Sequence, residues 1–265
     1  MVRGVSAEVG SLSFVLHPFN ATPAYVDLHQ GLVRQLEQKL HRRLHLTVSS
    51  DFDAYFDGLM TGQFDITICP PHFAMMSIQK GIYAPVLMFK RPIEPVLVVR
   101  KDSRYEKLAD LFHTRIAMAD RLAFMPIALV KLLSDRGLTA EKDYHIVERP
   151  THLAAIQHVV RGEADAALAG PFVVRTLAPE LSQQVRVIPI RQQLPNQFVL
   201  INRKLGNTVA GTLKGALRDF SVDSTDGKVF FDKTGLGGFD EISGDTINLL
   251  QSYVQTTRAM LMLIP

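Results

Sequence analysis

Hydrophobic and polar positions follow two alternating patterns along the chain. A short apolar run such as residues 11–18 predicts a buried strand, and longer segments with apolar residues four apart predict helices. Leu28, Leu32 and Leu36 give one such helix an apolar face, and Pro23 suits its first position. Strand and helix segments then follow each other through most of the chain. This alternation is typical of α/β folds in which helices cover mostly parallel sheets.

The predicted elements fall into two successive series, followed by a mainly helical remainder with a turn at residues 235–238. The predicted strands cover residues 11–18, 44–50, 64–69, 84–89, 96–100, 115–119, 143–148, 164–170, 185–190 and 197–204. The predicted helices between them cover residues 23–40, 51–62, 70–81, 104–112, 124–137, 151–162 and 171–178.

One stretch of the first series has a counterpart in the second. Residues 60–73 (MTGQFDITICPPHF) and 160–173 (VRGEADAALAGPFV) each contain a Gly, an Asp three positions later and a Pro six positions after that. The two stretches are offset by 100 residues. Each predicts a helix that ends at Gly, a buried strand, and a helix that begins at Pro. We therefore expect the same unit of structure to occur once in each of two lobes.

Two extended segments, residues 96–102 and 198–204, separate the two series and predict a double crossover between the lobes. The expected division is a first lobe of residues 1–97 and 200–265 and a second lobe of residues 98–199. A single continuous sheet would contradict this division.

Composition and charge exclude several classes of protein. The 265 residues are 47% hydrophobic and 21% charged, which argues against disorder. A net charge of +3, without a basic stripe interleaved with aromatic residues, argues against a nucleic-acid partner. A single cysteine, Cys69, excludes an internal disulfide. No apolar segment reaches the roughly 20 residues of a membrane span, so we expect contact with a membrane only through a partner.

Several stretches together carry a resemblance to a known family. Residues 51–74, 96–111 and 151–167, followed by FVLINRKL at 198–205, resemble in this order the phosphate/phosphite/phosphonate-binding proteins of ABC importers. The resemblance implies a two-lobe periplasmic-binding-protein fold of the second topological type, with two crossover hinge strands. It also implies lobes that close on a small ligand, and an ABC permease or a receptor as partner. Sensor domains of some membrane histidine kinases look similar.

The resemblance also points to binding positions and to departures from the family pattern. Phe52 stands where the family usually has a Tyr, and Glu94 lies close to the position of another. The family's loop of Ser and Thr hydroxyls corresponds to residues 120–124, which contain no hydroxyl. His152 matches the His of the family's second-lobe helix. Because the hydroxyls are missing and Glu94 repels anions, we expect simple alkylphosphonates to bind weakly or not at all.

The residues themselves suggest how a ligand could be held. His152 follows the N-cap candidate Thr151, so its ring could add a donor to the bare N–H groups of a helix start. Arg121 follows a strand and could form paired bonds to a carboxylate or a sulfur oxyanion, or else pair with Asp120 at the rim. The candidate ligand-binding residues are His17, Phe19, Asn20, Phe52, Pro71, His72, Phe73, Glu94, Arg121, Leu122, Ala123, Phe124, His152 and Gly170.

The expected function is that of a solute-binding protein that captures a small organic anion between two lobes for ABC import. We expect no metal, no cofactor and no catalysis, and a periplasmic location after removal of a signal peptide that this chain lacks; a cytoplasmic location stays open. One alternative is a ligand-sensing domain of a membrane receptor. The other is an enzyme on the same fold that uses Cys69 or His72.

Overall fold

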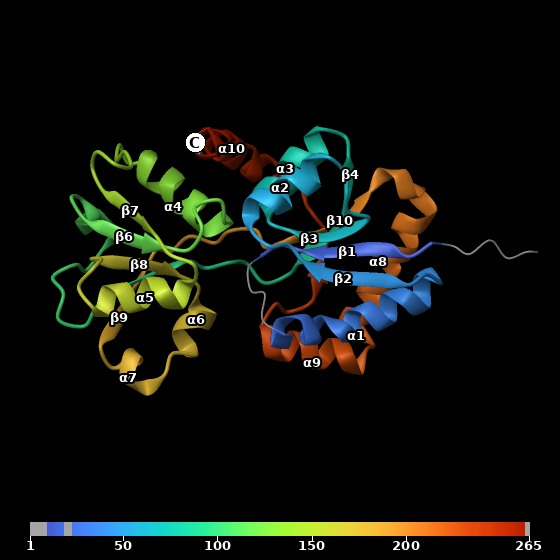
Figure 1. Cartoon of the computed structure of the whole chain (residues 1–265), viewed down its shortest axis with the longest axis horizontal. Coiled ribbons are helices and arrows are strands. Elements are labelled where there is room, and N and C mark those ends of the chain that lie inside the picture. Colours follow the sequence, from blue (N-terminus) through green and yellow to red (C-terminus); the bar gives the residue numbers. More distant parts are fainter. Residues whose placement is uncertain (1–9, 19–22, 263–265) are drawn as a thin grey trace, which may run out of the picture. The chain divides into compact units, whose positions relative to one another are not determined.

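The computed structural model describes residues 10–18 and 23–262. Contacts within the fold divide the chain into two units, each with its own β-sheet and covering helices (Figure 1). Unit 1 consists of residues 1–91 and 196–248, and unit 2 of residues 92–195 and 249–265.

The strands of unit 1 are β1 (Leu12–Leu16), β2 (Leu44–Val48), β3 (Ile66–Cys69), β4 (Tyr83–Phe89), β10 (Phe198–Asn202) and β11 (Phe239–Asp240). They form one sheet in the order β11-β4-β10-β3-β1-β2, in which β1 pairs in parallel with β2 and β3. β10 pairs antiparallel with β3 and β4, and β11 pairs antiparallel with β4. The helices of this unit are α1 (Pro23–Leu40), α2 (Phe52–Met60), α3 (Pro71–Gln79), the short 3₁₀ helix η2 (Arg203–Leu205), α8 (Gly206–Val222) and α9 (Thr225–Thr234).

The strands of unit 2 are β5 (Val96–Arg100), β6 (Arg115–Met118), β7 (His145–Glu148), β8 (Ala166–Ala169) and β9 (Val185–Pro189). Their order is β7-β6-β8-β5-β9, with β6 parallel to β7 and β8 and with β5 antiparallel to β8 and β9. The helices are the 3₁₀ helix η1 (Leu108–Leu111), α4 (Phe124–Ser134), α5 (His152–Val160), α6 (Pro171–Arg175) and α7 (Pro179–Ser182). The last helix, α10 (Gly244–Leu261), begins in unit 1 and continues in unit 2.

The two sheets share one strand order. In unit 1 the order β2-β1-β3-β10-β4 repeats, with the same directions, the order β7-β6-β8-β5-β9 of unit 2. In both sheets three parallel strands are followed by an antiparallel strand, β10 or β5, that comes after a crossing between the units. The prediction of an α/β fold with two mixed sheets flanked by helices is therefore confirmed.

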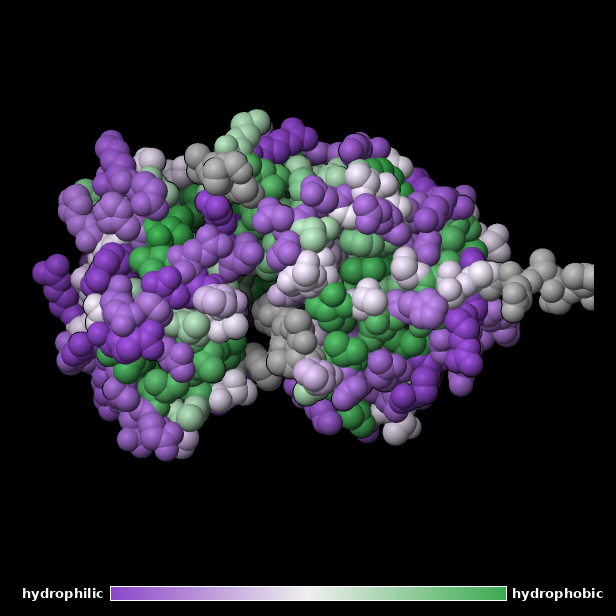
Figure 2. All heavy atoms as spheres, in the orientation of Figure 1, coloured by the Kyte–Doolittle hydropathy of each residue, from purple (hydrophilic) through white to green (hydrophobic). Residues whose placement is uncertain are grey.

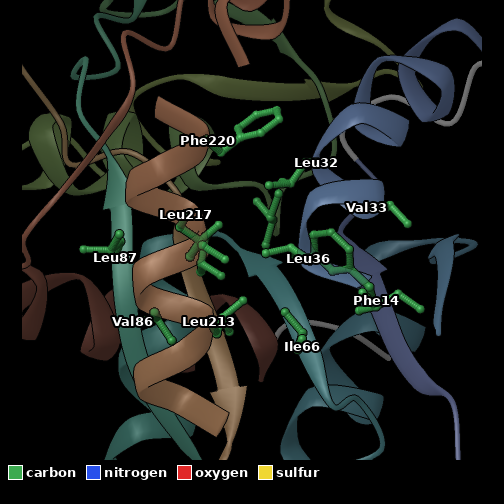
Figure 3. Packing of buried hydrophobic residues seen from close by; sticks show 14 of the residues in the cluster. Phe14, Leu32, Val33, Leu36, Ile66, Val86, Leu87, Leu213, Leu217 and Phe220 are labelled. Atoms are coloured by element: carbon green, nitrogen blue, oxygen red, sulfur yellow. The ribbon is translucent and has the colours of Figure 1, made fainter. Parts of the chain in front are cut away.

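The core of unit 1 lies between its sheet and the helices α1 and α8. Figure 3 shows Leu32 and Leu36 of α1 lying opposite Leu217 of α8, with Phe14 of β1 beside them. These four side chains are fully buried. Burial of each contributes about 1.5–3 kcal/mol to folding relative to an exposed position. The four-residue spacing of the leucines, seen in the sequence, is what brings them to this one face.

The sheet of unit 2 is buried on both faces. Leu97 and Met118 pack with α4 residues such as Leu129 on one face, whereas Val98 packs with Ile156 of α5 on the other. Adjacent residues of β5 thus point into different cores, as the alternation of a strand requires. A strand covered on both sides reads as a continuous apolar run, and residues 96–99 show that run.

The repeated Gly-x-x-Asp stretch has the same structural role in each unit. Gly62 and Gly162 both have a φ angle of +73°, the left-handed conformation that ends a helix. The Asp65 carboxylate accepts the backbone N–H of Ser13, at 2.9 Å. The Asp165 carboxylate accepts the N–H of Arg115, at 2.8 Å. Each Asp carboxylate therefore accepts a backbone N–H near the start of the neighbouring parallel strand, at the edge of the sheet where the parallel strands begin.

Hydrogen bonds join the chain segments at two of the crossings between the units; α10 makes a third crossing, between residues 248 and 249. Asn196 donates its side-chain N–H to the carbonyl of Arg91 at 2.7 Å, and Ile93 and Leu194 form an isolated antiparallel bridge. The first two crossings fall at residues 91–92 and 195–196. Residues 96–100 and 198–202, which the sequence suggested as crossover segments, are strands within unit 2 and unit 1, directly after the crossings.

Three parts of the chain differ from the sequence-based expectation. Residues 104–112 were expected to be a helix, but only the 3₁₀ turn η1 forms there, and residues 171–178 form only the short helix α6. Residues 249–265 were expected in the first lobe with residues 200–248, but their contacts assign them to unit 2. The cause lies in Tyr253 of α10, whose ring packs against Phe124 and whose hydroxyl accepts a hydrogen bond from Gln192.

Candidate functional site

In each unit the ends of the parallel strands meet the starts of the following helices, and the candidate residues lie at these edges. In unit 1, His17 follows β1, Phe52 begins α2, and Pro71 begins α3 directly after β3. In unit 2, residues 120–123 follow β6 and precede α4, and His152 begins α5. Ligands of open α/β sheets bind beyond the carboxyl ends of strands, where helix N-termini supply bare N–H groups.

The edge of unit 1 is built from buried aromatic rings. The ring of His17 lies 5.9 Å from that of Phe52 and 6.1 Å from that of Tyr55, and Phe52 lies 6.4 Å from Phe73. His72 contacts Phe73, with 4.2 Å between ring centroids. All five side chains are buried, and Pro71 is buried beside them. We call His17, Phe52, Tyr55 and Phe73 the aromatic cluster of unit 1.

Burial controls the charge state of His17. Loss of water lowers its pKa, a hydrogen bond with the Gln197 side chain raises it, and the charge on His29 lowers it, so that the net pKa is about 4. The imidazole is therefore neutral at pH 7, so in this state it offers a ligand hydrogen bonds but no positive charge. Phe19 and Asn20, which the sequence grouped with His17, lie outside the described residues.

Tyr55 and Thr67 fix the position of α2 relative to the central strands at this edge. The Tyr55 hydroxyl and the Thr67 hydroxyl are 2.6 Å apart, and Thr67 donates to the carbonyl of Val15 at 2.7 Å. These bonds link α2 to both central strands, β3 and β1. The sequence analysis did not single out either residue. The sequence feature that could have identified Tyr55 is its spacing of three positions from Phe52, which places both rings on one face of α2.

Cys69 has the environment of a core residue. Burial raises the pKa of its thiol above the usual range, and its described polar neighbours are the Pro70 carbonyl, 3.4 Å from Sγ, and the Tyr55 hydroxyl. Since the thiolate is the nucleophilic form, such a pKa disfavours chemistry at this sulfur. The alternative of an enzyme that uses Cys69 as its nucleophile therefore finds no support in this geometry.

In unit 2, the loop before α4 is held by its own carboxylates. The Asp120 carboxylate accepts the backbone N–H of Leu122 at 2.8 Å, and the Ala123 N–H bonds to the Asp120 carbonyl at 2.9 Å. The Glu148 carboxylate lies 3.3 Å from the backbone nitrogen of Arg121, which donates to it. The backbone donors of residues 121–123 are thus directed to acceptors of the protein itself.

Arg121 pairs with Glu148, whereas the sequence had left open a pairing with Asp120 or with a ligand. Its Nε lies 3.6 Å from a Glu148 carboxylate oxygen. The parallel register of β6 and β7 explains this choice, because Met118 aligns with Glu148 and the chain turns toward α4 just beyond. The Arg121 side chain is 33% exposed, so an incoming group can still reach it.

His152 occupies the first turn of α5, as predicted. Its N-cap, Thr151, accepts the Ala154 N–H at 3.0 Å. The Nδ1 atom of His152 lies 3.2 Å from the Leu168 carbonyl, and because a carbonyl can only accept, Nδ1 carries the proton. Burial lowers the pKa of the ring, while the bond to Leu168 raises it. His152 is therefore neutral at pH 7, and Nε2 is a donor only after the ring takes up a proton.

The other candidates of unit 2 differ in accessibility. Leu122 and Phe124 are buried, and Phe124 packs edge-on against Tyr253 of α10 at 5.3 Å. Ala123 and Gly170 are half-buried. Glu94 is exposed and accepts a hydrogen bond from Gln193 at 3.1 Å. Gly170 has no positive φ angle, and an added Cβ would only touch the Met125 thioether at 3.9 Å. The glycine is therefore not required by backbone geometry.

The two edges are related position by position. Asp51 caps α2 by accepting the N–H of Ala54, and Thr151 caps α5 in the same way, exactly 100 residues later. Phe52 and His152 are the first residues of these equivalent helices. Unit 1 therefore presents an apolar ring at a position where unit 2 presents an imidazole.

Two further properties bear on the class of protein. Among the described residues, no helix combines the length and the apolar character that crossing a membrane would require. In the same part of the chain, no group of three or more His, Cys, Asp or Glu side chains is arranged to hold a metal ion.

Two α/β units of this strand order, linked at residues 91–92 and 195–196, define the periplasmic-binding-protein class of the second topological type. The chain belongs to the family described as "ABC transporter, phosphonate, periplasmic substrate-binding protein", whose family model matches residues 14–247. It is thus a member of the phosphonate/sulfonate type of solute-binding proteins of ABC importers, as the resemblance in the sequence implied.

Solved structures show the same fold at low sequence identity. PhnD1 from Prochlorococcus marinus, in complex with methylphosphonate, has a TM-score of 0.79 at 13% identity and covers 96% of this chain and 99% of its own. XAC2383 from Xanthomonas citri, bound to ATP, has a TM-score of 0.77 at 16% identity and covers 96% and 100%. The aliphatic sulphonate binding protein SsuA from Escherichia coli has a TM-score of 0.67 at 16% identity and covers 97% and 94%.

Proposed function

We propose that this chain captures a small organic anion in the periplasm and delivers it to the permease of an ABC importer. The observation that supports the proposal is at the edge of unit 2, where Arg121 follows β6 and pairs with Glu148, the last residue of β7, and where α5 begins shortly after β7. A guanidinium and a helix N-terminus both attract an acid group. Family membership supports the transport role and the location, and solved relatives are described as binding methylphosphonate and aliphatic sulphonate.

The aromatic cluster of unit 1 supports an organic ligand over a bare inorganic anion. Small-molecule sites are lined mainly by apolar and aromatic side chains with a few polar groups among them. His17, Phe52 and Phe73 provide such a lining at the strand ends of unit 1, with a neutral imidazole as the polar group. Closing of the two lobes on the ligand, which the family resemblance implies, stays a prediction.

The first experiment is a thermal-unfolding screen of the purified chain against small carboxylates, sulfonates and phosphonates. A ligand at 100 times its dissociation constant adds about 2.7 kcal/mol to the free energy of unfolding, which gives a clear shift in Tm. Absence of a shift with every compound, followed by absence of heat in calorimetry, would argue against a solute-binding role.

The second experiment places the site. Arg121→Ala removes a charge-assisted bond, and His152→Ala removes a ring at the start of α5; each is expected to weaken binding of the ligand found in the screen by about 1.5–3 kcal/mol. Arg136→Ala is the matched control, because Arg136 lies just beyond the far end of α4 and its side chain bonds to the Leu132 carbonyl, a contact at the end of α4 remote from residues 120–124 in the sequence. Equal affinity in Arg121→Ala, His152→Ala and the control would mean that the site lies elsewhere.

A further inference from the structure

We propose that Asp120 and Glu148 determine the specificity of the site. Their carboxylates exclude doubly charged tetrahedral oxyanions from the loop between β6 and α4. The inference rests on the proposed function and narrows its substrate class to solutes with a singly charged acid group. It concerns which anions this edge of unit 2 rejects.

The first step is the state of the backbone donors. A loop between a parallel strand and a helix start binds phosphate or phosphonate when several N–H groups converge on an empty position. Here the N–H of Leu122 points to the Asp120 carboxylate and the N–H of Arg121 to the Glu148 carboxylate. The N–H of Ala123 is taken by the Asp120 carbonyl. The loop thus carries internal anions where an external one would bind.

The second step is the number of donors left to the helix. The third residue of α4 is Pro126, which has no N–H, and Ala123 at the N-cap position has no side-chain oxygen. A phosphonate dianion spreads two charges over three oxygens and needs several donors, whereas the first turn of α4 has at most the two N–H groups of Phe124 and Met125 ahead of Pro126. Its charge would also meet two carboxylates against the single guanidinium of Arg121.

The third step is the charge that this arrangement tolerates. A singly charged acid group can bind the exposed part of Arg121, which is fixed through Glu148, and its repulsion from the two carboxylates is half that of a dianion at the same place. The selection is therefore by charge and by donor number together. Removal of one negative charge should relax the first of these conditions, because it weakens the repulsion of a dianion.

The test measures methylphosphonate binding by calorimetry at a pH above the second ionisation of the phosphonate. The proteins are the wild-type chain, Asp120→Asn, Glu148→Gln and the double variant. Asparagine keeps an oxygen that can accept the Leu122 N–H, so the loop retains its fold while it loses the charge. Glu180→Gln, an exposed carboxylate of α7, is the control for net charge. We expect the affinity to rise about tenfold or more in Asp120→Asn and further in the double variant.

The outcomes separate the inference from the proposed function. Submicromolar binding of methylphosphonate by the wild-type chain would overturn the inference and support the proposed function. An equal affinity in the wild-type chain, both single variants and the double variant would also overturn it, whatever the screen of other solutes shows. A gain that appears equally in Glu180→Gln would trace to net charge and would count against the role of Asp120 and Glu148.

Discussion

His17 and His152 are buried imidazoles whose charged form is disfavoured by the loss of water. Each lies at the end of a strand or the start of a helix, where a protonated ring would favour an anion. The pKa of each is lowered, so the proton that would create this charge has to arrive together with the ligand or at low pH. If His152 contacts the acid group as a cation, affinity should fall as pH rises through the pKa of the bound state.

His17 also gives the fold a dependence on pH. Its pKa is about 4 in the folded chain and 6.5 when unfolded, so the unfolded chain binds more protons between these values. The contribution of His17 to stability is complete above pH 6.5 and is lost as pH falls toward about 4. The loss amounts to about 3 kcal/mol. Urea unfolding at several pH values should show this slope.

His17→Gln removes the titrating group and keeps an amide that can bond to Gln197. The variant should unfold with a smaller dependence on pH between 4 and 6.5 than the wild-type chain. An equal slope in the variant and in the wild-type chain would mean that His17 is not the group responsible.

The glycines that end helices show how one conformational requirement recurs in different surroundings. Gly62, Gly81 and Gly162 all have φ angles between +73° and +76°. An added Cβ would meet Ile82 at 3.1 Å at the first position, an Arg100 nitrogen at 3.8 Å at the third, and no heavy atom within 4 Å at Gly81. A side chain would therefore have the same conformational cost at all three positions, but a close steric contact only at Gly62.

A series of Gly→Ala variants separates these two costs. Gly81→Ala and Gly162→Ala should each lower the free energy of unfolding by about 1–2 kcal/mol, the cost of the left-handed conformation. Gly62→Ala should lower it further because Ile82 must move. Gly215→Ala, inside α8 with open space around it, should raise stability by up to about 1 kcal/mol. Denaturant unfolding checks the order, and a loss at Gly62 no larger than at Gly81 would contradict the steric argument.

The sequence predicts the elements better than it predicts the partners of their side chains. The caps Asp51 and Thr151 could be found because a cap acts on residues three positions away. The pairing of Arg121 with Glu148 could not, because it depends on the register of β6 against β7. The burial of Leu122 and Phe124 depends on packing across the chain, and for Phe124 one contact comes from α10, more than a hundred residues later. Local patterns carry no information about such contacts.

At the scale of the whole molecule, α10 connects the end of the chain to unit 2. Tyr253 contributes two separate contacts, its ring on Phe124 and its hydroxyl with Gln192. Loss of the hydroxyl in Tyr253→Phe should cost about 1 kcal/mol, and loss of the whole ring in Tyr253→Ala about 3–5 kcal/mol. Hydrogen exchange should show the larger effect in α4, next to Phe124. Faster exchange spread evenly over both units would argue that α10 does not belong to unit 2.

The strand order of unit 1 has a consequence for the newly made chain. β10 lies between β3 and β4, yet residues 90–197 separate it from β4 in the sequence. While the ribosome is still producing these residues, β3 has a partner on one side only, and β4 has none. Open strand edges invite pairing with other chains. The residues of unit 2 up to 195 are complete before β10 emerges, so the sheet of the first unit closes last.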